Sequence, residues 1–251
     1  MGLMQQRRPV ALAAAGALLL VALLIGTSLG AIALSPSGIV SSVLHSLGMR
    51  VGNPLPDTEF NLLMQIRMPR VVLAAMVGGM LALAGASYQG VFRNPLADPY
   101  LLGAAAGAGL GATVVIAYSP SGIGPIATLP MAAFVGALTG VGLSYALGAV
   151  AARHGGGSAT LLLAGVAVTA FLTAIQTLVQ QAKSESLRQV YSWILGQLGA
   201  GHWDEVRLVL PYMVGSTLVL LFAGRALDVL SVGDDEAITL GVHPRRVRFV
   251  V

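Results

Sequence analysis

The sequence has no cysteine and very little charge. Its 251 residues include no cysteine, and only 10% are Asp, Glu, Lys or Arg, whereas 56% are hydrophobic. The lack of cysteine excludes disulfides, thiolate metal sites and a cysteine nucleophile. A soluble domain carries roughly 25% charged residues, so we expect a polytopic membrane protein. The net charge of +4 fits cytoplasmic arginines beside membrane spans better than nucleic-acid binding.

Lysine and histidine are also scarce. Lys183 is the only lysine, and its surroundings do not match the G-x-x-x-x-G-K-[ST] loop that binds nucleotide phosphates. If the chain takes part in ATP-driven work, the ATPase must be another subunit. The histidines fall in loops or at the ends of apolar runs without metal-ligand spacing: His45, His154, His202 and His243. We therefore expect neither a metal site nor a cofactor on this chain.

Six apolar runs are long enough to cross a membrane, which takes about 20 residues. The expected spans are residues 10–34, 71–92, 100–118, 126–150, 159–181 and 206–223. Strong turn residues at 119–125 divide the third from the fourth. Val190–Gly201 is apolar but too short to cross, so we expect a re-entrant or interfacial helix there.

The first run and its arginines set the expected orientation. The uncharged stretch Val10–Leu34 is longer than the about 7–15 residues of a signal-peptide core, so it is interpreted as a span. Arg7 and Arg8 directly precede it, which favours a cytoplasmic N-terminus. The expected outer connections are then the mostly polar Ser35–Ile66 and Lys183–Trp203, and the expected inner ones are Arg93–Asp98, Arg153–Gly157 and Arg225–Arg248.

An arginine pair stands where the second span begins. Arg67 and Arg70 are three residues apart, with Pro69 in the expected first helical turn. Two cations at a helix N-terminus oppose the macrodipole, so an acidic partner should compensate them. Lipid phosphate, or Asp57 and Glu59 on the same side, would suffice.

A proline-locked turn joins the second and third spans. It reads Asn94-Pro95-Leu96-Ala97-Asp98-Pro99, and its two prolines prevent either helix from simply continuing. Just beyond it, glycine recurs every fourth residue at Gly103, Gly107 and Gly111. This spacing predicts close packing between membrane helices.

A charged segment follows the sixth span. Gly233 separates an apolar patch at 227–232 from a second short helix, which Asp234 or Asp235 is expected to cap. Pro244 should end that helix. The pattern alone favours an ordinary surface helix that connects two spans.

Two classes of membrane protein are disfavoured by the residues that the apolar runs lack. A secondary transporter typically carries ionisable residues inside the membrane, and the central parts of the six runs have none. An intramembrane enzyme would need a nucleophile with a partner, yet no histidine lies near the single hydroxyls Ser87, Ser144 and Ser216. Both alternatives are disfavoured but stay open.

Four stretches together resemble the FecCD-type permeases, the membrane subunits of ABC importers for iron-siderophores, haem and cobalamin. They are R-x-P-R at 67–70, N-P-L-A-D-P at 94–99, L-L-L-A-G-V-A at 161–167 and G-D-D-E-A-I-T-L-G-V-H-P at 233–244. The resemblance implies an all-α transmembrane bundle, with residues 1–251 forming one permease domain. Because the family has about ten spans and about six are expected here, it also implies that the last four are missing.

The resemblance further implies partners and site residues. The permease would pair with a second permease subunit as a homodimer, with two ATP-binding cassette subunits and with an extracytoplasmic binding protein, in a bacterial inner membrane. Arg67 and Arg70 would dock the binding protein, and Asn94, Pro95 and Leu96 would form the inner gate. The residues that would couple to the ATPase are Gly233, Asp234, Ala237, Leu240 and Gly241. Transport would proceed by alternating access, without catalysis on this chain and with the substrate left open.

Overall fold

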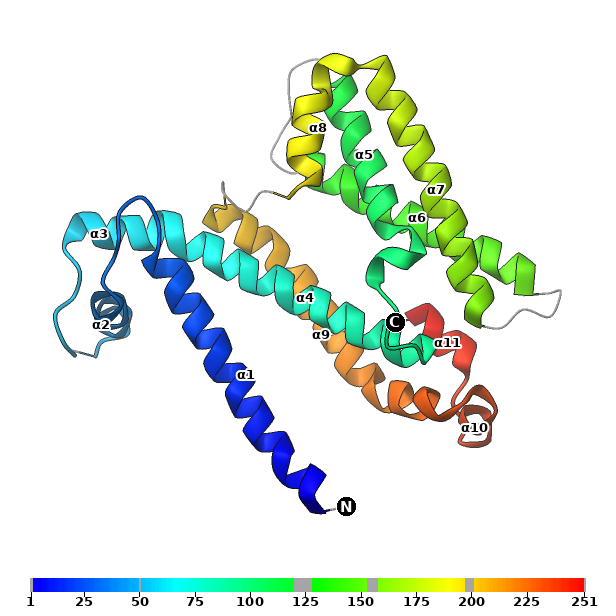
Figure 1. The fold of residues 1–251 in the computed structure, drawn as a ribbon, viewed down its shortest axis with the longest axis horizontal. Helices are drawn as coiled ribbons and strands as arrows, with labels where there is room; N and C mark the ends of the chain where they lie inside the picture. Colours follow the sequence, from blue (N-terminus) through cyan, green and yellow to red (C-terminus); the bar gives the residue numbers. More distant parts are fainter. Residues whose placement is uncertain (1, 50, 120–127, 153–157, 197–200, 251) are drawn as a thin grey trace. The chain divides into compact units, whose positions relative to one another are not determined.

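Helices form all of the regular structure that can be described. A computed structural model describes residues 2–49, 51–119, 128–152, 158–196 and 201–250, and it contains no strand within these ranges. Figure 1 shows the helices in chain order. The described segments long and apolar enough to span a membrane number five: Pro9–Ser28, Asp57–Phe92, Thr128–Ala151, Thr160–Ala182 and Trp203–Val232. The expectation of an all-α polytopic membrane protein is confirmed.

Contacts divide the chain into two compact units. The first combines residues 1–79 with 198–214, and the second combines residues 80–197 with 215–251. Two of the boundaries fall within long helices, α4 (Met68–Phe92) and α9 (Trp203–Val232).

The first unit starts with α1 (Gly2–Ser28), which ends six residues before the predicted limit at Leu34. The predicted polar connection that follows is in fact largely helical, with α2 (Pro36–Ser46), α3 (Asp57–Leu62) and the π-helix η1 (Leu63–Arg67). The Ser35 hydroxyl accepts the Gly38 N–H at 3.1 Å and so caps α2. Four buried side chains form one hydrophobic cluster that holds this connection together: Leu34, Ile39, Leu55 and Leu63.

The N-terminal part of α9 packs against α4 in the same unit. Leu73 and Met76 of α4 form a buried cluster with Val206. The indole N–H of Trp203 donates to the Met64 carbonyl at 2.8 Å. Trp203 therefore fixes the start of α9 against the π-helical turn that leads into α4.

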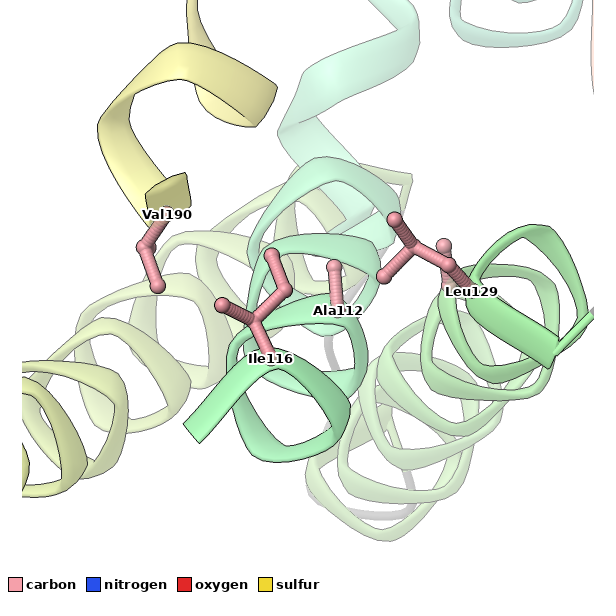
Figure 2. Close-up of a cluster of buried hydrophobic side chains, with 5 residues drawn as sticks. Ala112, Ile116, Leu129 and Val190 are labelled. Carbon is pink, nitrogen blue, oxygen red and sulfur yellow. The ribbon is translucent and has the colours of Figure 1, made fainter. Parts of the chain in front are cut away.

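The second unit contains a three-helix core. It consists of α5 (Ala104–Tyr118), α6 (Thr128–Ala152) and α7 (Ser158–Ala182), and the short helices η3 (Ser184–Ser186) and α8 (Leu187–Ile194) follow. Figure 2 shows Ala112 and Ile116 of α5 between Leu129 of α6 and Val190 of α8. With eight residues, α8 is too short to cross a membrane, and its interfacial position stays a prediction.

The predicted close packing along the glycine-repeat face is confirmed. A Cβ atom on Gly107 would lie 2.1 Å from the Gly136 carbonyl oxygen, and one on Gly111 would lie 2.2 Å from that of Ala132. Side chains would push the backbones of α5 and α6 apart, so these glycines permit the contact.

The third and sixth predicted spans have different limits from those expected. Residues 99–102 form a 3-10 helix, η2 (Pro99–Leu102), which leaves α5 with 15 residues. At 1.5 Å per residue α5 is about 22 Å long, shorter than the about 30 Å hydrocarbon core. By contrast, α9 continues to Val232, beyond the predicted end at 223. The predicted turn at 119–125, apart from Ser119, and the loop at 153–157 lie outside the described residues.

Candidate functional site

Arg67 is buried against the end of α1. Its side chain is 7% exposed, and one guanidinium nitrogen, Nη1, donates to the carbonyl oxygens of Thr27 at 2.7 Å and Ser28 at 2.8 Å. Nη2 donates to the Ile32 carbonyl. The last carbonyls of a helix lack intrahelical partners and attract cations. Arg67 therefore closes the C-terminal end of α1 and is not the surface charge that the sequence predicted.

Arg70, by contrast, is exposed, and it borders an open pocket of about 270 Å³. The segment 29–32 that follows α1 lines most of one side of this pocket, and the other lining residues are Gly26, Leu62, Ile66, Arg67 and Val71. Among the described residues, neither Asp57 nor Glu59 forms an ion pair with either arginine. The compensating carboxylates considered from the sequence are therefore not Arg70's partners, and its cation is available at the surface.

The turn after α4 is stabilised by its own side chains. The Asn94 Oδ1 atom accepts the Leu96 N–H at 2.9 Å, and the Asp98 Oδ1 atom accepts the Tyr100 N–H at 2.7 Å. Asp98 thereby caps η2. Leu96 is 84% exposed. Asn94 and Pro95 thus shape a compact turn that presents a leucine at its tip.

An apolar cluster holds the base of the same turn. Ala97 is 5% exposed and packs in one buried cluster with Val91 and Phe92, at the end of α4, and Leu102 of η2. Leu227, near the end of α9, packs against this cluster. The turn is consequently fixed to the helices on either side of it and to α9.

The charged segment after α9 forms two short helices, α10 (Asp234–Thr239) and α11 (Pro244–Val250). The predicted break before Pro244 is confirmed. The predicted cap is wrong: Gly233 occupies the N-cap position of α10, without a side-chain cap. Asp234 lies in the first turn, where its carboxylate is drawn to two arginines, Arg93 at 3.4 Å and Arg248 at 2.7 Å.

Burial separates the predicted coupling residues into two groups. Gly233 and Ala237 are buried, and Ala237 is 0% exposed. Leu240 is 67% exposed, and so is its neighbour Ile238 at 61%. Gly241 has a φ of 79°, a conformation that glycine adopts without strain. Leu240 and Ile238 are therefore the side chains that a partner could contact.

Three residues of the candidate site around α10 were not predicted from the sequence. Ile238 stands beside the residues selected for coupling, and its apolar character was a usable signal. Arg93 and Arg248, which bind Asp234, gave no such signal, because their pairing joins residues 141 and 14 positions apart.

These features define a polytopic α-helical membrane protein with a compact turn and a short helical pair attached to its long helices. The chain belongs to the FecCD transport family, whose model matches residues 18–251.

Relatives and a solved structure agree with this assignment. The chain is 34% identical over 238 residues to the uncharacterized ABC transporter permease protein YvrB of Bacillus subtilis, covering 93% of this chain and 66% of that one. It is 38% identical over 195 residues to the cobalamin import system permease protein BtuC of Halobacterium salinarum, covering 77% and 51%. The chain thus spans about half to two thirds of the length of these relatives.

The fold has a counterpart among solved structures. A structure described as an inward-facing metal-chelate type ABC transporter superposes with a TM-score of 0.78 at 24% identity, covering 96% of this chain and 71% of that chain. At this identity the likeness establishes the fold.

Proposed function

We propose that the chain is the membrane permease subunit of a binding-protein-dependent ABC importer. The observation that carries this proposal is the family match across residues 18–251, together with relatives that are import permeases by name. The substrate is a large chelate or corrinoid: an iron-siderophore, haem or cobalamin. Transport proceeds by alternating access in a bacterial inner membrane, with the N-terminus in the cytoplasm.

The proposed complex supplies ATP hydrolysis from other chains. Two ATP-binding cassette subunits, a second permease subunit and an extracytoplasmic binding protein complete the importer. The sequence supports a separate ATPase because its single lysine, Lys183, lies outside any phosphate-loop motif. No catalytic residue and no cofactor is assigned to this chain.

Arg70 is proposed to dock the binding protein on the outer side. Its charge is exposed and has no ion-pair partner among the described residues. A carboxylate on the binding protein would complement it, and such surface charges speed encounter and set register. Arg67 contributes indirectly, since it holds the end of α1 beside the pocket that Arg70 borders.

The turn formed by Asn94, Pro95 and Leu96 is proposed as part of the inner gate. A gate element must be well defined yet present a side chain to the path. The Asn94 side chain and the buried Ala97 fix the conformation of the turn, and Leu96 is its exposed apolar side chain.

The α10 segment is proposed to contact the ATPase through Leu240 and Ile238. Large exposed apolar side chains mark interaction surfaces when they are clustered. Leu240 and Ile238 are two such side chains, only two residues apart. Gly233 and Ala237 support the contact from inside, and Gly241 allows the chain to turn after α10.

The proposal is tested by purifying the full importer with its ATPase and binding protein from the native host and reconstituting it in proteoliposomes. Uptake of ferric siderophore, haemin or cobalamin should require ATP inside the vesicles and the binding protein outside. Uptake driven by a proton or sodium gradient without ATP would instead establish a secondary transporter.

A further inference from the structure

An arginine occupies a backbone position that normally suits glycine. Helix α4 ends at Phe92, and the Asn94 N–H donates to the Gln89 carbonyl at 3.3 Å. This six-residue closure places Arg93 in the left-handed conformation, with a φ of 51°. A side chain there is disfavoured relative to glycine. Among the described residues, Arg93 is the only non-glycine residue with a positive φ.

That side chain reaches the carboxylate of Asp234. Arg93 Nη2 lies 3.4 Å from Asp234 Oδ1, and the two side chains are 39% and 36% exposed. The pair joins the turn after α4 to the first turn of α10. Solvent screens a half-exposed pair at this distance, so the contact is of modest strength.

Arg248 holds the same carboxylate more firmly. Its Nη2 atom lies 2.7 Å from Asp234 Oδ1 and 2.9 Å from Oδ2, and its side chain is only 14% exposed. Arg248 therefore fixes Asp234 within the α10–α11 pair, whereas Arg93 forms the looser contact. Phe249, beside Arg248, meets the Tyr145 ring of α6 edge-on at 5.7 Å.

We propose that Asp234 is a positioning residue that links the turn at 94–96 to the α10–α11 pair. A displacement of α10 then moves the turn through the Arg93–Asp234 contact, while Arg248 keeps the carboxylate in place. This inference rests on the proposed function, which makes α10 the ATPase contact and the turn an inner gate. It adds the connection between the two.

The first test follows the turn itself. A single cysteine, Leu96→Cys, is introduced into the cysteine-free chain at an exposed site. Its rate of maleimide labelling is measured in nanodisc-embedded importer, with and without ATP and vanadate. Nucleotide should change the rate, and Asp234→Asn should reduce that change by at least about two- to fivefold, because the substitution weakens the exposed pair with Arg93 and also removes the charge that Arg248 binds.

Asp235→Asn is the matched control. It removes the same charge from the neighbouring residue, which forms no ion pair among the described residues. The nucleotide-dependent change at residue 96 should stay at the wild-type value in this variant.

A second test varies the charge at position 93 while the backbone residue stays the same. Arg93→Cys is modified with 2-aminoethyl methanethiosulfonate, which adds a cation, or with 2-sulfonatoethyl methanethiosulfonate, which adds an anion. Both products place the same residue in the left-handed position, so backbone strain is matched. Substrate carried per ATP hydrolysed should recover with the cation and fall with the anion.

The outcomes separate this inference from the proposed function. If wild-type importer carries substrate with ATP but Asp234→Asn labels like Asp235→Asn, the connection through Asp234 is refuted and the proposed function stands. Equal coupling with the two Arg93→Cys products refutes it as well, and this measurement does not depend on folding of the Asp234 variant. If nucleotide does not change the labelling rate of residue 96 in the otherwise wild-type importer, the connection is also refuted. If no ATP-driven uptake occurs, the proposed function is refuted.

Discussion

Replacing Arg67 by alanine should destabilise the protein far more than the same change at Arg70. The Arg67 guanidinium is buried and binds the carbonyl oxygens of Thr27, Ser28 and Ile32. A hydrogen bond to a charged group contributes about 1.5–3 kcal/mol, and a cation at a helix C-terminus adds up to about 2 kcal/mol. These contributions overlap because they share one side chain.

The expected loss for Arg67→Ala is therefore about 3–5 kcal/mol, with part of the sum recovered by water that reaches the carbonyls. Arg70→Ala should change stability by less than about 0.5 kcal/mol, since its exposed side chain forms no ion pair with any described residue. Gly30→Ala offers an independent check. A Cβ atom there would lie 2.7 Å from Arg67 Nη2, so the variant should displace the guanidinium and lower stability in the same direction.

The assay is thermal unfolding of the detergent-solubilised protein, followed by tryptophan fluorescence. Trp203 is a suitable reporter because its indole binds the Met64 carbonyl in the same unit. Arg67→Lys should fall between wild type and alanine, since an ammonium keeps the charge but not the planar fork. Equal unfolding temperatures for Arg67→Ala and Arg70→Ala would refute the assignment of Arg67 to the end of α1.

Three further outcomes are expected. Arg70→Glu should weaken binding-protein association about tenfold or more at physiological salt, measured by biolayer interferometry; an unchanged affinity would exclude docking through this residue. Gly107→Ala should cost about 1–3 kcal/mol in thermal unfolding because its Cβ would clash with a carbonyl, whereas Gly142→Ala, with open space around it, should not. Leu240→Ala should weaken ATPase association about tenfold in pull-down titrations, while Ala237→Leu should destabilise the α10 segment; the reverse ranking would reassign the contact surface.

Local signals in the sequence located most helices but not their ends. Apolar run length gave α4, α6 and α7 within a few residues, because a membrane span needs a continuous apolar stretch. The end of α1 was missed, since it is set by Arg67, some forty positions later in the chain. Helix α9 extends beyond the predicted end because the prediction followed apolar run length, whereas charges on a helix surface do not end a helix.

The connection at residues 35–66 contains a helix signal that its polarity concealed. Ser35 followed by Pro36 is a helix start, because serine caps and proline fits the first turn. Polarity suggested a loop instead. The core of Leu34, Ile39, Leu55 and Leu63 depends on contacts distant in sequence, so its existence required the structure.

The α10 segment illustrates why residue type alone did not identify the proposed contact surface. The family resemblance assigned Gly233 and Ala237 to the ATPase contact, yet both residues are buried. Small side chains serve equally well where a helix must approach its own neighbours closely, and only burial distinguishes the two uses. The polar end of α10 is bound to two arginines through Asp234, and its other end exposes Leu240. Because one end is anchored and the other is free to bind, force applied at Leu240 acts on a helix already attached to the turn after α4.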